Sequence, residues 1–90
     1  METYRLIVFG KVQGVWYRKF VKDLAQELGY VGYVKNMDDG SVKVIVNIEL
    51  DSELEYFINK LYEGSTFSEV KNIECQKIDF CKFDTFEIIE

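Results

Sequence analysis

The chain has 90 residues, of which 48% are hydrophobic and 16% aromatic, and its formal net charge is −5. This composition excludes a disordered polar chain, and the length allows one domain over residues 1–90 whose core needs no disulfide or metal. The negative charge argues against nucleic acid as a partner. Without an apolar run of ~20 residues or a visible signal peptide, we expect no membrane contact and a cytoplasmic location.

The first predicted elements are a strand, a glycine-bearing loop and a helix. Residues 4–9 are nearly all apolar, as expected of a central strand. A loop over residues 10–15 leads into a helix over roughly residues 16–29, where Gly29 is placed to end it. The apolar side chains of this helix lie on one stripe, formed by Phe20, Val21, Leu24, Ala25 and Leu28.

A strand, a turn and a second strand are predicted next. Residues 31–36 include side chains of good β propensity, and the pair Asp39-Gly40 suits a left-handed backbone at the end of the turn. The following side chains alternate in character, which predicts a strand with one buried face. That face carries Val42, Val44, Val46 and Ile48.

The second half of the chain predicts a helix and two further strands. Asp51 or Ser52 can cap the helix, and Gly64 ends it. The buried stripe of this helix comprises Leu54, Phe57, Ile58, Leu61 and Tyr62. Residues 69–78 predict a fourth strand of weaker pattern, and residues 85–89 a short last strand.

The element order is βαββαβ followed by the short extra strand at the C-terminus. This order predicts an α+β, ferredoxin-like sandwich. We expect an antiparallel sheet of strand order 4-1-3-2, with the first and third strands central and two helices on one face. Many unrelated proteins use this fold, so the fold alone gives no function.

The stretch from Gly10 to Arg18 carries the strongest functional signal. Gly10 and Gly14 let the backbone turn tightly without Cβ atoms in the way. The first N–H groups of the following helix have no intrahelical partners and lie at the positive end of its dipole, which favours a phosphate or carboxylate. Arg18 adds a charged, planar donor suited to phosphate oxygens. Each residue also has an ordinary interpretation, since glycines serve in turns and most arginines are solvated.

Two motifs make the chain resemble the acylphosphatases over essentially its whole length. The first is Gly10-Lys11-Val12-Gln13-Gly14-Val15-Trp16-Tyr17-Arg18, and the second is Gly32-Tyr33-Val34-Lys35-Asn36 followed, after three residues, by Gly40-Ser41-Val42. The resemblance implies the ferredoxin-like fold and the hydrolysis of acyl phosphates to a carboxylate and inorganic phosphate. It also implies direct in-line attack of water, without a protein nucleophile, a metal or a cofactor.

The same resemblance implies roles for individual residues. The Arg18 guanidinium would bind the phosphoryl oxygens, more tightly in the transition state than in the ground state. Asn36 would orient the attacking water through its side-chain amide, although an asparagine before a turn is most often a turn former. The backbone N–H groups that would cradle the phosphoryl oxygens belong to Gln13, Gly14, Val15, Trp16, Tyr17 and Arg18.

The expected partners follow from the resemblance as well. They are a small-molecule acyl phosphate as substrate and inorganic phosphate as product and inhibitor, and we expect a monomer. The chain has no histidine, which removes the usual neutral-pH base, and with only Cys75 and Cys81 it has too few ligands for a zinc site. We expect both cysteines to be packing or surface residues, with a redox or catalytic role as the alternative.

The charge distribution suits an anionic substrate near the two motifs. Basic side chains outnumber acidic ones by seven to five in residues 1–47, whereas residues 48–90 hold four basic and eleven acidic side chains. The motif-bearing half can therefore provide a local positive field on an otherwise acidic protein. Ordinary solvated surfaces without a binding function would give the same distribution of charges.

Some residues depart from the family pattern. Trp16 stands where the family often has a small residue, and it is either a bulky lip of the pocket or a packing residue. Tyr17 replaces the usual phenylalanine, and both Tyr17 and Tyr33 are expected to pack rather than bind substrate. Ile48 replaces an expected glycine, and the loop over residues 64–68 lacks the usual prolines, which leaves its rigidity open.

Three other functions fit the sequence less well. A nucleotide triphosphate loop is absent, because Gly14 is not followed by the required lysine and hydroxyl residue. An RNA-recognition domain would need exposed aromatic side chains on the third strand, and residues 41–48 have none. The strongest alternative is a regulatory domain that binds a small anion without turnover, which would need the loop but not Asn36.

Overall fold

The computed structural model describes residues 1–90. The elements in chain order are β1 (Glu2–Lys11), α1 (Tyr17–Leu28), β2 (Val31–Asn36), β3 (Val42–Ile48), α2 (Asp51–Glu63), β4 (Glu69–Ile78) and β5 (Phe86–Ile89). The predicted order of elements is confirmed. The helices are too short and too polar for any of them to span a membrane.

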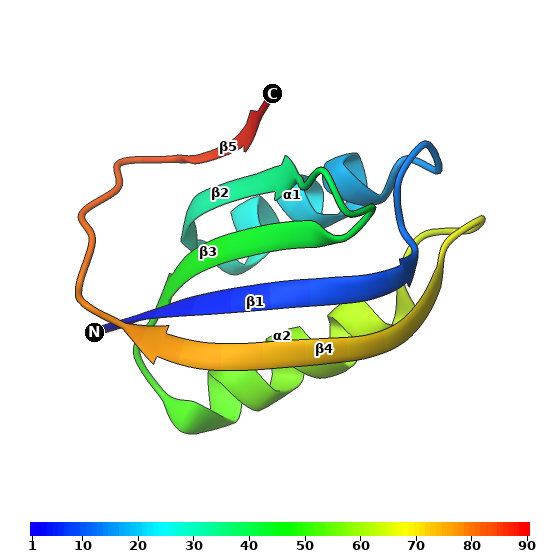
Figure 1. Ribbon diagram of the computed structural model, residues 1–90. Coiled ribbons are helices and arrows are strands. Elements are labelled where there is room, and N and C mark those ends of the chain that lie inside the picture. The colour runs from blue at the N-terminus through cyan, green and yellow to red at the C-terminus, as the bar shows by residue number, and fades with distance from the viewer.

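The strands form one five-stranded sheet of order β4-β1-β3-β2-β5. The predicted order 4-1-3-2 is confirmed for the first four strands, which pair antiparallel with β1 and β3 at the centre. β5 adds a parallel pair beside β2 that the expectation of an antiparallel sheet did not include. Figure 1 shows both helices on the same side of the sheet, so the architecture is the predicted two-layer sandwich.

The core lies between the sheet and the two helices. The inward side chains of β1 and β3 are fully buried because these strands are central in the sheet. They pack against the apolar stripes of the helices. The largest fully buried side chains are Tyr17, Phe57, Phe86, Leu6, Ile48 and Leu61. Gly29 ends α1 in a left-handed conformation, as predicted.

The segment between β4 and β5 covers part of the opposite face of the sheet. Asn47 Nδ2 donates to the carbonyl oxygen of Cys81 at 2.8 Å, and the Cys81 N–H donates to Thr3 Oγ1 at 3.0 Å. Thr3 Oγ1 in turn donates to Asn47 Oδ1 at 2.5 Å. Asn47 is consequently buried, and Ile45 on the same face of β3 is buried as well, so the prediction that β3 has only one buried face was wrong.

The start of α2 also differs from the prediction. Leu50 is the cap residue and Asp51 is already the first helical residue, so neither Asp51 nor Ser52 caps the helix. Instead the Glu53 side chain reaches back, and Leu50 N–H donates to Glu53 Oε1 at 3.2 Å. A carboxylate in the first turn is favourable at the positive end of the helix dipole.

The strands β2 and β3 approach each other closely at Gly32. Its φ is 147°, and a Cβ atom built there would collide with the carbonyl oxygen of Ile45 on β3. Gly32 is also paired with Phe86 of β5 on its other side, so β2 is held within the sheet between β3 and β5. Because β2 ends at Asn36, the absence of a side chain at Gly32 helps to fix the position of Asn36.

We expect Gly32→Ala to lower the free energy of unfolding by about 3 kcal/mol, from backbone strain and overpacking together. The matched control is Gly29→Ala, which meets no atom within 4 Å and should cost about 1 kcal/mol for its left-handed backbone alone. Urea unfolding of the two variants measures the difference. Equal losses would show that the β2–β3 approach is not tight.

Candidate active site

The loop between β1 and α1 presents backbone N–H groups that have no partner in the protein. Gly14 and Trp16 both have left-handed backbones, with φ of 72° and 65°, and α1 begins at Tyr17 without a side-chain cap. No N–H group of residues 13–18 donates to a backbone or side-chain acceptor. Such groups at a helix N-terminus form a binding site for an anion.

Three side-chain hydrogen bonds hold this loop in place. Gln13 Nε2 donates to the carbonyl oxygens of Met37 and Ser41, at 2.8 Å each. Ser65 Oγ donates to the carbonyl oxygen of Val15 at 3.0 Å. The loop is thereby tied to the β2–β3 turn and to the α2–β4 connection, while its own N–H groups stay unpaired. The serine contact also shows how the α2–β4 connection is fixed without proline.

Tyr17 is the third side chain that anchors the loop, after Gln13 and Ser65, and it does so from inside the core. Its hydroxyl donates to the carbonyl oxygen of Leu61 on α2 at 2.9 Å, and the ring is buried. Burial raises the pKa of Tyr17 well above its ordinary value. The expectation that Tyr17 packs is confirmed, and only its backbone N–H remains as a candidate ligand for substrate.

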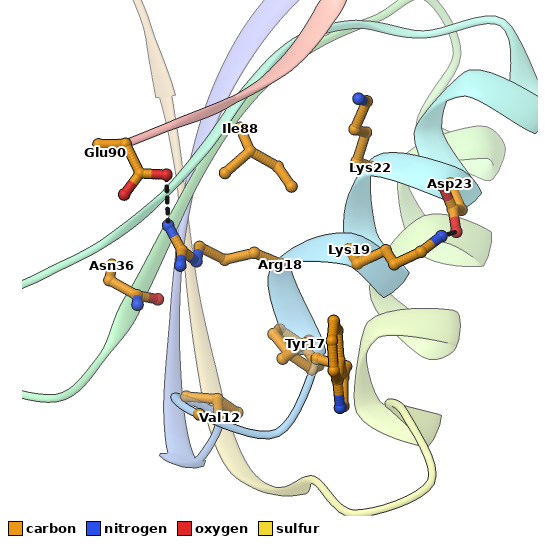
Figure 2. A pocket seen from close by; sticks show the side chains of 11 residues that line it. Val12, Tyr17, Arg18, Lys19, Lys22, Asp23, Asn36, Ile88 and Glu90 are labelled. Carbon is orange, nitrogen blue, oxygen red and sulfur yellow. Dashed lines mark hydrogen bonds and ion pairs between the residues drawn. The ribbon is translucent and has the colours of Figure 1, made fainter.

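Arg18 lies one residue into α1 and its side chain is 30% exposed. Figure 2 shows the guanidinium reaching from α1 toward Asn36 and Glu90. Arg18 Nη1 lies 3.9 Å from Glu90 Oε1, and the Glu90 side chain is 92% exposed. An ion pair this exposed contributes at most about 1 kcal/mol, so a better-bound anion can displace the Glu90 carboxylate from Arg18.

Asn36 is the last residue of β2 and pairs with Val42 of β3. Its Oδ1 atom is buried, and no donor of the protein reaches it. A buried acceptor without a donor costs folding free energy, which makes this atom a candidate to accept a hydrogen bond from a bound molecule. This geometry is compatible with the functional role that the family resemblance implies for Asn36, and that role stays a prediction.

The turn after Asn36 is stabilised by its own hydrogen bonds. Asp39 Oδ1 accepts from Ser41 Oγ at 2.5 Å and from Ser41 N–H at 2.9 Å. Both bonds hold the pKa of Asp39 below its ordinary value, and the bond from the Ser41 hydroxyl contributes more than the bond from the Ser41 N–H. Asp39 therefore stays an ionised acceptor at neutral pH, and the turn keeps the carbonyl oxygens that receive Gln13 in place.

These elements surround one pocket with a volume of about 610 Å³. Among the predicted site residues, the pocket lining brings together Gly14, Trp16, Tyr17, Arg18 and Asn36, whereas Gln13 and Val15 do not line it. Lys19 also lines the pocket, but its ammonium group is paired with Asp23 at 2.7 Å.

Outside the pocket, Cys75 and Cys81 are exposed free cysteines, as expected. No group of three or more potential metal ligands exists in the chain.

Sequence reasoning missed some contributors to the pocket. Ile88 and Glu90 come from the end of the chain and line the pocket because β5 pairs with β2, a parallel contact that no motif announces. Lys22 also lines the pocket. It could have been found, because it follows Arg18 by four residues and therefore shares its helix face. The anchoring role of the Gln13 side chain was likewise not foreseen.

The comparisons with known proteins identify the family. The family model for acylphosphatase matches residues 4–88. The chain belongs to the acylphosphatase family. Hydrolysis of acyl phosphates is the activity of this family, so the resemblance seen in the two motifs is confirmed.

Individual acylphosphatases agree with this assignment in sequence and in structure. The acylphosphatase of Solibacter usitatus is 40% identical over 87 residues, which cover 97% of this chain and 90% of the relative. That of Shewanella amazonensis is 45% identical over 74 residues, covering 82% and 80%. The crystal structure of acylphosphatase from Bacillus subtilis superposes with a TM-score of 0.92 at 35% identity, covering 100% of both chains.

We expect Gln13→Met to lower the free energy of unfolding by about 2 kcal/mol. The change keeps the side-chain volume but removes both bonds from Nε2 to the Met37 and Ser41 carbonyl oxygens, at about 1 kcal/mol each. Each carbonyl oxygen keeps one backbone donor, from Gly40 N–H and Met37 N–H respectively. Gln26→Met is the matched control, because Gln26 makes a single, longer bond of 3.3 Å to the Phe86 carbonyl oxygen and should cost less than half as much. Chemical denaturation of both variants measures the difference, and equal costs would mean that Gln13 does not anchor the loop.

Proposed function

We propose that this protein hydrolyses acyl phosphates by direct in-line attack of water on phosphorus. The observation that carries the proposal is one pocket that combines unpaired N–H groups of the β1–α1 loop, the Arg18 guanidinium and the unpartnered Asn36 Oδ1. Together these groups can hold a phosphoryl group and a water molecule. A carboxylate is a good leaving group, so the reaction needs little proton donation to it.

The phosphoryl group is bound by the loop and by Arg18. The N–H groups of residues 13–18 point partial positive charge toward its oxygens. Arg18 contributes a full positive charge and a planar pair of donors. Because the loop is already anchored by Gln13 and Ser65, its N–H groups need little reorganisation when charge builds up in the transition state.

Asn36 positions the attacking water. Its Oδ1 accepts a hydrogen bond from the water, and its Nδ2 can donate to a phosphoryl oxygen at the same time. The water oxygen forms the new bond to phosphorus while the bond from phosphorus to the acyl oxygen breaks. The electron pair of the broken bond leaves on the carboxylate, and the protons of the water end on the phosphate product.

The proposal includes the product as an inhibitor, a single-chain active unit and a cytoplasmic location. Inorganic phosphate should compete with substrate because the loop and Arg18 recognise the phosphoryl group rather than the acyl group. We expect a monomer to be active because the loop, Arg18 and Asn36 of one chain share the pocket, so the proposed mechanism needs no group from a second chain. A cytoplasmic location is supported by two exposed cysteines that form no disulfide, as is usual in a reducing compartment.

The first prediction separates Arg18 from Asn36. Arg18→Ala should lower kcat/KM by ~10²–10³, equivalent to about 3–4 kcal/mol, and should weaken inhibition by phosphate. Arg18→Lys should recover little, because an ammonium group cannot reproduce the bidentate fork. Asn36→Ala should lower kcat strongly and leave the phosphate inhibition constant nearly unchanged, since Asn36 acts mainly on the water.

The controls for these variants come from the chain itself. Arg5→Ala removes the other arginine, which bonds to Gln76 on the sheet, and Asn59→Ala removes an exposed asparagine of α2. Both controls should keep full activity, and circular dichroism should show every variant folded. If folded Asn36→Ala turned over benzoyl phosphate normally, Asn36 would not orient the water. If the wild-type protein bound phosphate without any turnover, a regulatory anion-binding domain would be the better account.

A second prediction concerns pH and chelation. Burial raises the pKa of Tyr17 and hydrogen bonding lowers that of Asp39, so both shifts move these groups away from neutrality. With no histidine in the chain, kcat should stay flat between about pH 5.5 and 7.5 on ordinary side-chain values. Activity should survive EDTA. An enzyme-derived inflection near pH 6.5, or a loss that added metal restores, would contradict the proposed mechanism.

A further inference from the structure

The Trp16 side chain lines the pocket without any packing role inside the protein. It is 74% exposed, and it belongs neither to the core nor to the partly buried side chains that pack against the core. The indole donates no hydrogen bond within the protein and stacks on no other aromatic ring. Of the two alternatives that the sequence left open for Trp16, packing is therefore excluded.

The backbone at Trp16 is unfavourable for such a residue. With φ of 65° and ψ of 16°, it is the sole non-glycine residue of the chain at positive φ. A bulky side chain in this region is an outlier, and the cap position of a helix favours asparagine or glycine instead. The indole therefore adds strain to the folded state and, being exposed, gains little from burial in return.

The geometry of the proposed reaction places the acyl group near this indole. In an in-line displacement the leaving group departs on the side opposite to the attacking water. Figure 2 shows Asn36, which would hold the water, near the guanidinium end of Arg18, and the first turn of α1 with Tyr17 and Lys19 at the opposite, backbone end of this side chain. Trp16 directly precedes this turn and lines the same pocket, so it lies on the side where the acyl group leaves.

We propose that Trp16 forms an acyl-group subsite that selects acyl phosphates with an aromatic or similarly flat apolar acyl group. The inference rests on the proposed function, because it takes the phosphoryl group to be bound by the neighbouring N–H groups. An aromatic acyl group can stack on the indole face and remove apolar surface of both rings from water. An acetyl group is too small to cover the ring, so Trp16 discriminates between the two substrates.

The kinetic test compares benzoyl phosphate with acetyl phosphate. The ratio of their kcat/KM values cancels any effect of a substitution on phosphoryl binding, which both substrates share. Trp16→Asn, which tolerates the left-handed backbone, should lower the benzoyl-to-acetyl ratio about tenfold. Trp16→Phe should keep most of the ratio. The matched control is Phe80→Asn, which removes a 61% exposed aromatic ring outside the pocket and should leave the ratio unchanged.

A binding test is independent of turnover. Trp16 is the single tryptophan of the chain, so tryptophan fluorescence, excited selectively over the tyrosines, reports on this indole alone. Benzoylphosphonate and acetylphosphonate carry the same non-hydrolysable phosphonyl group. Benzoylphosphonate should shift the emission to shorter wavelength and bind more tightly, whereas acetylphosphonate should leave the wavelength nearly unchanged.

The strain at Trp16 has a separate test. Trp16→Asn should raise the midpoint of thermal unfolding, because it relieves strain without removing internal contacts.

Each outcome separates the subsite from the proposed function. An unchanged benzoyl-to-acetyl ratio in Trp16→Asn, or equal fluorescence responses to both phosphonates, would overturn the subsite while leaving the hydrolase intact. A loss of kcat/KM that is equal for both substrates would also overturn it, since Trp16 would then act only through the loop backbone. If neither substrate were hydrolysed, the proposed function would fail, and the fluorescence titration would still decide whether Trp16 contacts an aromatic acyl group.

Discussion

The structure depends on one constraint: the loop after β1 must keep its N–H groups unpaired while its backbone stays fixed. Backbone donors normally find an acceptor in the folded protein, and a loop with unpaired donors would ordinarily rearrange to satisfy them. Here the anchoring is done by side chains that bind carbonyl oxygens, from Gln13, Ser65 and Tyr17. The donors of residues 13–18 would thus be available to an anion without loss of order in the loop.

The same anchors join the two halves of the site. Gln13 binds the turn that follows Asn36, so the loop that would hold the phosphoryl group and the residue that would hold the water move as one unit. The close approach of β2 to β3 at Gly32 fixes that unit against the central sheet. Within this frame the Arg18 guanidinium is held only by a long, exposed pair with Glu90, so a bound anion would compete for it with little cost. Fixed donors and a cation without a strong partner together suit a reaction whose transition state is mainly a redistribution of charge.

Much of this arrangement could be predicted from sequence, because it depends on local signals. Apolar periodicity predicted the helices and strands, and the resemblance carried by the two motifs implied that the loop, Arg18 and Asn36 belong to one site. Features that depend on long-range contacts could not be predicted. Nothing in residues 85–89 shows that β5 pairs parallel with β2 and brings Glu90 to Arg18. The burial of Asn47 depends on the β4–β5 segment, whose Cys81 follows it by more than thirty residues. The left-handed backbone of Trp16 was equally hidden, because tryptophan is a residue that normally avoids it.

The most direct test of the account is a titration of the ¹⁵N-labelled protein with inorganic phosphate, followed by amide chemical shifts. We expect the largest changes at the N–H groups of residues 13–18, together with the side-chain amide of Asn36. The start of α2 provides an internal comparison, because it is also a helix N-terminus but carries Asp51 and Glu53 in its first turn and should not respond. Changes spread over both helix starts, or absent from residues 13–18 at saturating phosphate, would contradict the claim that the anchored loop is the phosphoryl site.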